Sequence, residues 1–258
     1  MYETILEALF PLSETEKELF SCRPCDISSI LPPSPNYSGL AVPLPEGTSL
    51  FAYKDTRVEQ LIWNIKYKKS RQAVEIGGYE LFGKLCEINM VAPASDFQDT
   101  PSKPAGFAAG SQSPTLLPKR PSNSEAGATR LLIIPIPITK LRRRERGYNQ
   151  CELLVDEVER LDKEAKFISE NNLLIRMHHD GRHTLKGRTD RVESAKGIFG
   201  VDESTLKKLT EKYGADKIKN CKVVIIDDVI TTGSTMREAI DTMKKSGFTN
   251  VSGLSVAH

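Results

Sequence analysis

The sequence lacks the features that mark membrane-spanning and secreted proteins. It has no run of about 18 apolar residues, the minimum that a membrane-spanning helix needs. Its start has no basic stretch followed by an apolar one, as a signal peptide would require. The 5 cysteines are scattered and suggest no disulfide framework. From these absences we expect a cytoplasmic, reduced protein that has no membrane partner.

Strong charge of one sign and the common nucleotide-binding motifs are also missing. The net charge is only +2 at pH 7, which does not by itself require a nucleic-acid partner. The chain contains neither G-x-x-x-x-G-K-[ST], the phosphate loop of nucleoside triphosphatases, nor G-x-G-x-x-G, the dinucleotide fingerprint. A phosphate site in this chain must therefore be built in another way.

What the chain does have is a strand–turn–helix pattern at residues 223–235, which read Val-Val-Ile-Ile-Asp-Asp-Val-Ile-Thr-Thr-Gly-Ser-Thr. The four β-branched residues predict a buried parallel strand that ends at Asp227 and Asp228. A hydroxyl- and glycine-rich turn then leads into an amphipathic helix from about Met236 onward. The N–H groups of such a turn can hold a phosphate, and paired carboxylates can accept hydrogen bonds from ribose hydroxyls. The pattern predicts a site for a phosphorylated sugar, because a generic strand–turn–helix unit rarely carries tandem carboxylates.

A second segment, residues 133–150, combines an apolar strand, two prolines and a cluster of basic side chains. Arginines at the mouth of a sheet suit an anion of high charge density such as pyrophosphate. The candidates are Arg142, Arg143 and Arg146. A solvated, basic helix start remains an alternative. Contact with a nucleic-acid backbone is another, although no aromatic stacking platform accompanies the run.

The rest of the chain reads as an α/β protein. Apolar periodicity predicts helices at about 57–68, 71–88, 149–163, 204–213 and 236–246, and strands at 131–136, 173–176, 197–201, 223–226 and 251–256. Such alternation favours a parallel sheet, whose ligands bind at the carboxyl ends of the strands. Residues 91–130 are rich in proline, serine and alanine and predict a disordered insertion. Residues 182–191 are polar and basic, as either a mobile lid or a surface loop would be.

Several motifs in this order resemble one known family. They are Leu61–Tyr67, Pro135–Pro137, Arg146–Gln150, Arg188 and Arg191 ahead of Gly197–Phe199, and the pattern at 223–235. With them the chain resembles the ComF family of competence-associated, type I phosphoribosyltransferase-like proteins, over roughly 51–90 and 131–258. Family members often open with a four-cysteine zinc module, of which only Cys22 and Cys25 remain, too few to close a tetrahedral site. Ser194, and His183 or Thr184, stand where the family commonly has Asn and Gln.

The resemblance implies a fold and a set of site residues. The fold is the type I phosphoribosyltransferase fold, a central, mainly parallel sheet flanked by helices with a small hood or lid region. Residues 1–50 would be an N-terminal extension containing the degenerate zinc module, and residues 51–258 the phosphoribosyltransferase-like domain, interrupted by the insertion at 91–130. Asp227 and Asp228 would be catalytic and bind the ribose hydroxyls of phosphoribosyl pyrophosphate (PRPP). The loop for its 5′-phosphate would be Thr231, Thr232, Gly233, Ser234 and Thr235. The lid would be His183, Lys186, Arg188 and Arg191.

The implied activity is displacement of pyrophosphate from C1 of PRPP by a nitrogenous base, a pentosyl transfer of nucleoside metabolism. Mg²⁺ would arrive bound to the substrate. Thr231 stands where purine-salvage relatives have an acid, which disfavours hypoxanthine or guanine as the acceptor. The alternative is a non-catalytic, PRPP- or nucleotide-binding accessory protein that partners proteins of DNA uptake or recombination. Direct DNA binding through residues 142–146 is a third hypothesis, and a homodimer is left open.

Overall fold

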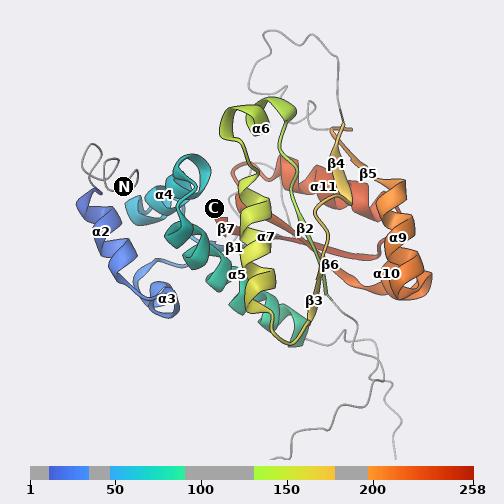
Figure 1. Ribbon diagram of the computed structural model, residues 1–258, viewed down its shortest axis with the longest axis horizontal. Helices are drawn as coiled ribbons and strands as arrows, with labels where there is room; N and C mark the ends of the chain where they lie inside the picture. The colour runs from blue at the N-terminus through green and yellow to red at the C-terminus, as the bar shows by residue number, and fades with distance from the viewer. Residues whose placement is uncertain (1–11, 35–46, 91–130, 178–196) are drawn as a thin grey trace, which may run out of the picture.

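The core of the protein is a five-stranded parallel sheet with helices on both faces (Figure 1). The computed structural model describes residues 12–34, 47–90, 131–177 and 197–258. The strand order is β1-β7-β6-β2-β3, and every neighbouring pair is parallel. The strands are β1 (Gly47–Phe51), β2 (Leu131–Pro135), β3 (Phe167–Ser169), β6 (Lys222–Val229) and β7 (Asn250–Ala257). The predicted α/β class with a mainly parallel sheet is confirmed.

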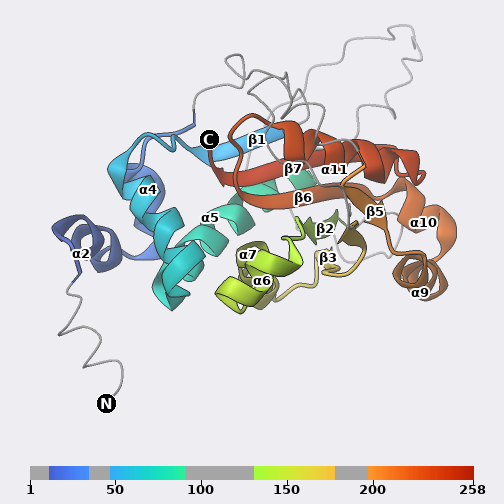
Figure 2. The same ribbon diagram turned by 90° about the horizontal axis from the view of Figure 1, so that it is seen from above.

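Alternate side chains of the central strands enter two apolar clusters, one on each face of the sheet. On β2, Leu131 and Ile133 belong to the first cluster, and Leu132 and Ile134 to the second. Helices α4 (Thr56–Trp63), α5 (Arg71–Met90) and α7 (Gln150–Leu161) cover the first, and α9 (Glu203–Tyr213), α10 (Ala215–Asn220) and α11 (Ser234–Lys245) the second. Figure 2 shows α5 and α7 across the sheet from α11. Burial on both faces explains why these strands read as continuous apolar runs.

A small antiparallel pair of strands stands beside the main sheet. It consists of β4 (Leu174–Arg176) and β5 (Phe199–Val201), with Arg176 opposite Phe199. Their apolar side chains Leu174 and Phe199 join the second cluster next to α11. The predicted lid residues between these strands, His183, Lys186, Arg188 and Arg191, lie outside the described residues, as does the predicted insertion at 91–130.

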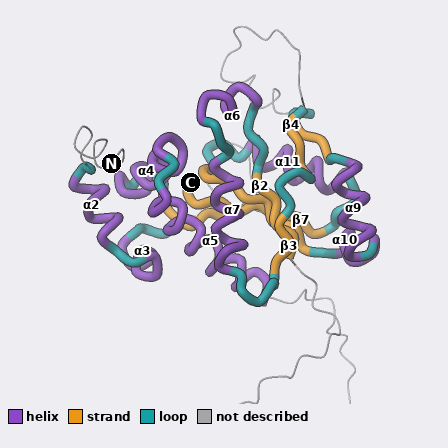
Figure 3. Tube along the Cα trace, viewed as in Figure 1, coloured by secondary structure: helices purple, strands orange, loops and turns teal. Residues whose placement is uncertain are grey.

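The structure corrects one boundary and adds elements that the apolar pattern does not predict. The motif strand does not end at the aspartates, because its ladder with β7 continues to Val229, which pairs with Ala257. The carboxylates therefore project from the last residues of β6 and not from a following loop. They include the short edge strands β1 and β3 and helix α6 (Lys140–Arg146). Figure 3 labels β3 and α6.

Residues 12–34 share the core of the sheet. Leu19 of α2 (Glu14–Ser21), Ile27 of α3 (Ile27–Ile30) and Leu31 belong to the apolar cluster that also contains Phe51. A single 3-10 turn, η1 (Pro24–Asp26), links these two helices. The domain boundary drawn between residues 50 and 51 falls inside β1, which pairs with β7 from Gly47 onward. None of the helices in the described ranges combines the length and the apolarity needed to span a membrane.

A buried polar network ties α2 to the end of α4. The chain after α4 forms one π-helical turn, η3 (Asn64–Lys68). The carboxylate of Glu16, a residue that is 2% exposed, accepts a hydrogen bond from Asn64 Nδ2 at 2.9 Å and pairs with Lys68 Nζ at 2.8 Å. Burial alone would raise the pKa of Glu16, but hydrogen bonds from Lys68, the Ser13 backbone and Asn64 together lower it from 4.5 to about 2. The N-terminal helix and the π-turn are thus joined through one ionised carboxylate.

Helix α5 crosses α7 at a point where only glycine fits. A Cβ atom at Gly78 would meet Cγ and Cβ of Glu157, the latter at 2.7 Å, whereas one at Gly83 on the same helix would meet nothing within 4 Å. Because overpacking costs about 1–3 kcal/mol, Gly78→Ala should lower the free energy of unfolding by that amount in a denaturant titration. Gly83→Ala, the matched control, should be neutral or stabilise by about 0.5–1 kcal/mol, since alanine favours a helix over glycine. Equal effects of the two variants would contradict this packing.

The Glu16 network predicts a pH-dependent contribution to stability. Because the pKa of Glu16 is lower in the folded than in the unfolded protein, its ionised form stabilises the fold above about pH 4.5, and this contribution is lost as the pH falls toward 2. The difference in unfolding free energy between the wild type and Glu16→Gln should therefore shrink from pH 5 to pH 3, as measured by urea denaturation. Glu14, whose side chain is 91% exposed, supplies the control Glu14→Gln. A difference that stays constant over this range would refute the prediction.

Candidate functional site

The motif lies at the point where the winding of the sheet reverses. From β2 the chain goes on to β3 at one edge, and from β6 it goes on to β7 in the opposite direction. β2 and β6 are neighbours, with Pro135 opposite Ile226 near their carboxyl ends. Loops that leave adjacent parallel strands in opposite directions open a crevice, the usual ligand site of such sheets. The two sequence segments singled out above, residues 133–150 and 223–235, both enter this crevice.

The two aspartates at the end of β6 have different surroundings. Asp228 is 3% exposed, and its carboxylate meets Lys66 Nζ at 2.6 Å and accepts a hydrogen bond from Gln150 Nε2 at 3.3 Å. Asp227 is only half-buried, and its Oδ1 accepts hydrogen bonds from the backbone N–H of Asp228 at 2.9 Å and from the thiol of Cys151 at 3.5 Å. The protein itself neutralises Asp228, which leaves Asp227 as the carboxylate more open to a ligand.

The close packing of ionisable groups around the two aspartates shifts the pKa values of Asp227, Cys151 and Lys66. Burial raises the pKa of Asp227 well above its usual value, and the negative charge of Asp228 raises it further. Burial and the same two carboxylates raise the pKa of the Cys151 thiol, so the thiol stays protonated and acts as a hydrogen-bond donor. Burial alone would lower the pKa of Lys66, but the attraction of Asp228 raises it overall. A cation or several hydroxyl donors beside Asp227 would favour its ionised form.

The turn after β6 presents an open helix N-terminus. Thr231 and Thr232 are exposed, and Gly233 precedes α11 with a φ of 77°, a conformation that favours glycine. No side chain caps α11, and the hydroxyls of Thr232 and Ser234 lie 3.0 Å apart. The first N–H groups of a helix lack partners within the helix and attract anions. The predicted phosphate loop, residues 231–235, therefore leads into a helix N-terminus that no side chain caps, and its role in phosphate binding stays a prediction.

The three predicted pyrophosphate arginines lie on α6, and the side chains of two of them, Arg143 and Arg146, have different partners. The Thr139 hydroxyl caps this helix by accepting the N–H of Arg142, and Gly147 ends it. Arg143 pairs with Glu152 at 2.6 Å. Arg146 donates to Gln150 Oε1 at 2.9 Å, and Gln150 in turn donates to Asp228, so Arg146 is connected to the acidic pair.

Three residues of the site are not predicted from the sequence as site residues: Lys66, Gln150 and Cys151. The π-turn delivers Lys66 to Asp228, while the Tyr148 hydroxyl donates to Ile65 O at 3.0 Å and accepts from the N–H of Lys69 at 3.1 Å. The sequence indicates two of these residues in part, because Lys66 lies in Leu61–Tyr67 and Gln150 in Arg146–Gln150, two of the motifs that carry the family resemblance. A lysine that follows an amphipathic helix reads first as a partner of the helix dipole.

The acidic pair can take part in holding a magnesium ion but cannot enclose one. One ligand atom each from Cys151, Asp227 and Asp228 lies within 4.8 Å of the others. The thiol is protonated and Asp228 is engaged by Lys66, so Asp227 is the oxygen ligand that remains. Mg²⁺ prefers oxygen ligands and is usually held by one or two carboxylates together with substrate phosphates. These residues fit an ion that arrives with its substrate. Cys22 and Cys25 belong to no such group among the described residues.

Comparisons with known proteins agree with this geometry. Residues 189–254 match the phosphoribosyl transferase domain. Competence protein F of Haemophilus influenzae is 32% identical over 116 residues, which are 45% of this chain and 44% of that protein. Competence protein ComFC of Bacillus subtilis is 28% identical over 116 residues, which are 45% of this chain and 39% of that protein. The matches therefore span less than half the length of either relative. With its parallel sheet and the matched domain, the chain has the type I phosphoribosyltransferase fold, and over 116 residues it is similar to competence proteins of the ComF family.

Proposed function

We propose that the protein binds PRPP and transfers its phosphoribosyl group to a nitrogenous base with release of pyrophosphate. The observation that carries the proposal is the pairing, at one switch point, of the half-buried carboxylate of Asp227 with the uncapped N-terminus of α11. Such an N-terminus suits the 5′-phosphate, and the carboxylate suits the ribose hydroxyls. Both groups stand on rigid elements of the sheet and its helix, as a preorganised site needs.

In this reaction the base nitrogen bonds to C1 of the ribose while the C1–oxygen bond breaks, and pyrophosphate leaves with the electron pair. Negative charge develops on the leaving group, so cations held near it accelerate the step. Arg146, fixed by Gln150, is the arginine of α6 that is linked to the acidic pair. Asp227 would hold the ribose and help to hold a substrate-borne Mg²⁺, which would neutralise pyrophosphate charge. The exposed Thr231 carries no group that can remove a proton from the base.

Binding without turnover is the alternative. The names of the two relatives speak of competence, and a protein that serves DNA uptake or recombination as an accessory could use PRPP or a nucleotide only as a signal. The same acidic pair and phosphate turn would serve both roles. Pyrophosphate release therefore separates them, and PRPP binding alone does not.

The test of the proposal is the variant Asp227→Asn. A substitution of Asp228 would also remove the ion-pair partner of Lys66, so its effect on ligand binding could not be separated from an effect on the fold. Loss of a charge-assisted hydrogen-bond acceptor should weaken PRPP binding about tenfold or more. Thermal stabilisation by PRPP with Mg²⁺ measures binding, and pyrophosphate release over a panel of bases measures turnover. Asp216→Asn, at an exposed position on α10, is the matched control and should behave as the wild type. Undiminished PRPP binding by Asp227→Asn would refute the role of this carboxylate.

A surface next to the site favours a second candidate, the binding of single-stranded nucleic acid. Trp63 and Tyr67 are 44% and 59% exposed, and their rings lie 5.9 Å apart. Lys68 Nζ lies 4.9 Å from the ring centre of Trp63, and the Arg146 guanidinium 4.9 Å from that of Tyr67. Exposed rings among cations are the elements with which proteins stack bases and follow a phosphate backbone. The end of α4 and the π-turn thus supply the aromatic platform that the basic run at 142–146 lacks in the sequence.

The second candidate predicts weaker binding when either ring is removed. Stacking of one base on an aromatic side chain contributes about 1–3 kcal/mol, so Trp63→Ala and Tyr67→Ala should each lower the affinity for a fluorescent oligothymidine accordingly. Fluorescence anisotropy at several salt concentrations should also show an affinity that falls steeply with salt. Tyr79→Ala removes a ring that is 39% exposed on α5 and is the control. Wild-type affinity in both platform variants would exclude this surface.

A further inference from the structure

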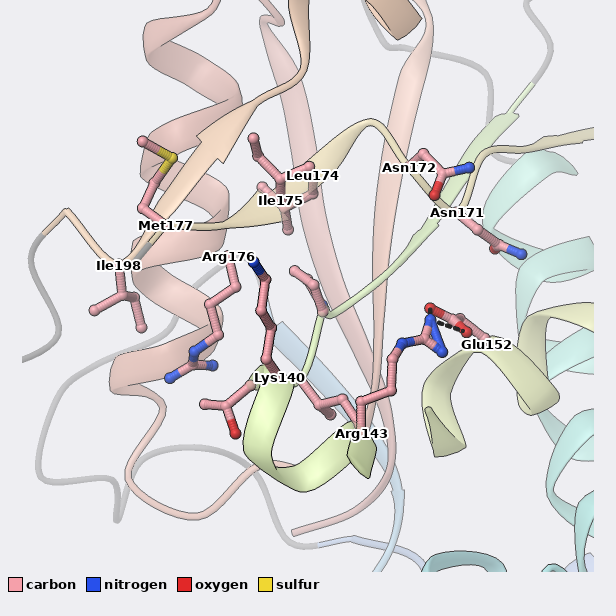
Figure 4. Close-up of a pocket in the computed structure, with 13 residues that line it drawn as sticks. Lys140, Arg143, Glu152, Asn171, Asn172, Leu174, Ile175, Arg176, Met177 and Ile198 are labelled. Carbon is pink, nitrogen blue, oxygen red and sulfur yellow. Dashed lines mark hydrogen bonds and ion pairs between the residues drawn. The ribbon is translucent and has the colours of Figure 1, made fainter. Parts of the chain in front are cut away.

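A pocket of about 390 Å³ lies between the start of α6 and strand β4, apart from the acidic pair (Figure 4). It is bordered on one side by Pro137–Lys140 and Arg143, and on the other by Asn171, Asn172 and Leu174–Met177. Neither Asp227 nor Asp228 lines it. Its volume falls in the range of roughly 300–1,000 Å³ that is usual for small-molecule sites.

Positive charge predominates in the pocket. Of its three cationic side chains, Arg143 points to Glu152 and is compensated by it, as the dashed lines in Figure 4 show. Lys140 and Arg176 form no ion pair with any carboxylate of the described residues. Burial lowers the pKa of Arg176, repulsion from Arg142 lowers it further, and attraction to Asp227 offsets part of the effect. A bound anion would relieve this repulsion.

The remaining walls suit a flat ring. Ile138, Leu174, Ile175 and Ile198 give the pocket apolar surface, and Asn171 and Asn172 also line it. Small-molecule sites commonly combine apolar walls with a few polar groups in this way.

We propose that this pocket holds the acceptor of the phosphoribosyl group, and that the acceptor is a nitrogen heterocycle that carries a carboxylate. The planar guanidinium of Arg176 matches a carboxylate with two parallel hydrogen bonds. A phosphate group would be served better by the open N-terminus of α11. A bare pyrophosphate has no apolar surface that could pack against the apolar walls of the pocket, whereas a heterocycle has. The pocket begins at Pro137, directly after β2, and β2 pairs with β6, the strand that carries Asp227, so the pocket lies at the same edge of the sheet as the proposed ribose site. The inference rests on the proposed function.

The test compares matched acids and neutral amides by isothermal titration calorimetry on the full chain, with and without PRPP and Mg²⁺. The probes are nicotinate against nicotinamide, and a pyrimidine carboxylate against its amide. At least one acid should bind about tenfold more tightly than its amide, as a charge-assisted bidentate pair predicts. Arg176→Gln should abolish that preference and keep the thermal shift with PRPP. Arg71→Gln, which removes a charge whose side chain is 88% exposed, should keep both.

The outcomes separate the pocket from the proposed transfer. An acid preference that is absent, or that survives in Arg176→Gln, overturns the inference, as does displacement of the bound acid by inorganic pyrophosphate. If PRPP with Mg²⁺ does not raise the melting temperature of the wild type, while the wild type still prefers the acid, phosphoribosyl transfer is refuted and only an anion pocket remains. Retention of both, with pyrophosphate released only in the presence of an acid probe, supports the full proposal.

Discussion

The buried ion pair between Lys66 and Asp228 is the constraint around which the site is built. Asp228 is nearly inaccessible to solvent, and an unpaired buried carboxylate is strongly destabilising, so the lysine must be delivered to it. A regular helix does not bring it there; the π-turn after α4 does, and this turn is held by Glu16 on one side and by the Tyr148 hydroxyl on the other. Segments far apart in the sequence therefore depend on one another at this point.

The same ion pair gives the two neighbouring carboxylates, Asp227 and Asp228, different roles. Asp228 is already neutralised, so it orders Gln150 and, through it, Arg146. Asp227 remains with a raised pKa caused by burial and by its charged neighbour. A ligand gains most by bringing hydroxyl donors or a cation to Asp227, because these favour the ionised carboxylate. A phosphorylated pentose accompanied by a divalent cation supplies both.

The sequence predicts the parts of this protein that local patterns determine. The apolar run of β6, the turn at Gly233 and the helix periodicity of α5, α7, α9 and α11 are legible because each depends on residues close in the chain. The edge strands β1 and β3 are short, and their pairing with β7 and β2 defines them. The same holds for Lys66, whose partner lies on another strand, and for the pocket beside α6, which β4 completes from the other side. Such features come from tertiary pairing, which periodicity does not encode.

The basic run on α6 shows how helix geometry distributes a single charge cluster. Arg143 and Arg146 are three residues apart, so they lie on one side of the helix, and both meet side chains of α7, Glu152 and Gln150. The charge of Arg142 acts instead on Arg176, whose pKa it lowers. Arg146 also covers the Tyr67 ring, at the aromatic surface, whereas Arg143 borders the pocket. The arginines are therefore not interchangeable, and a role assigned to the run as a whole has to be resolved into separate roles for each side chain.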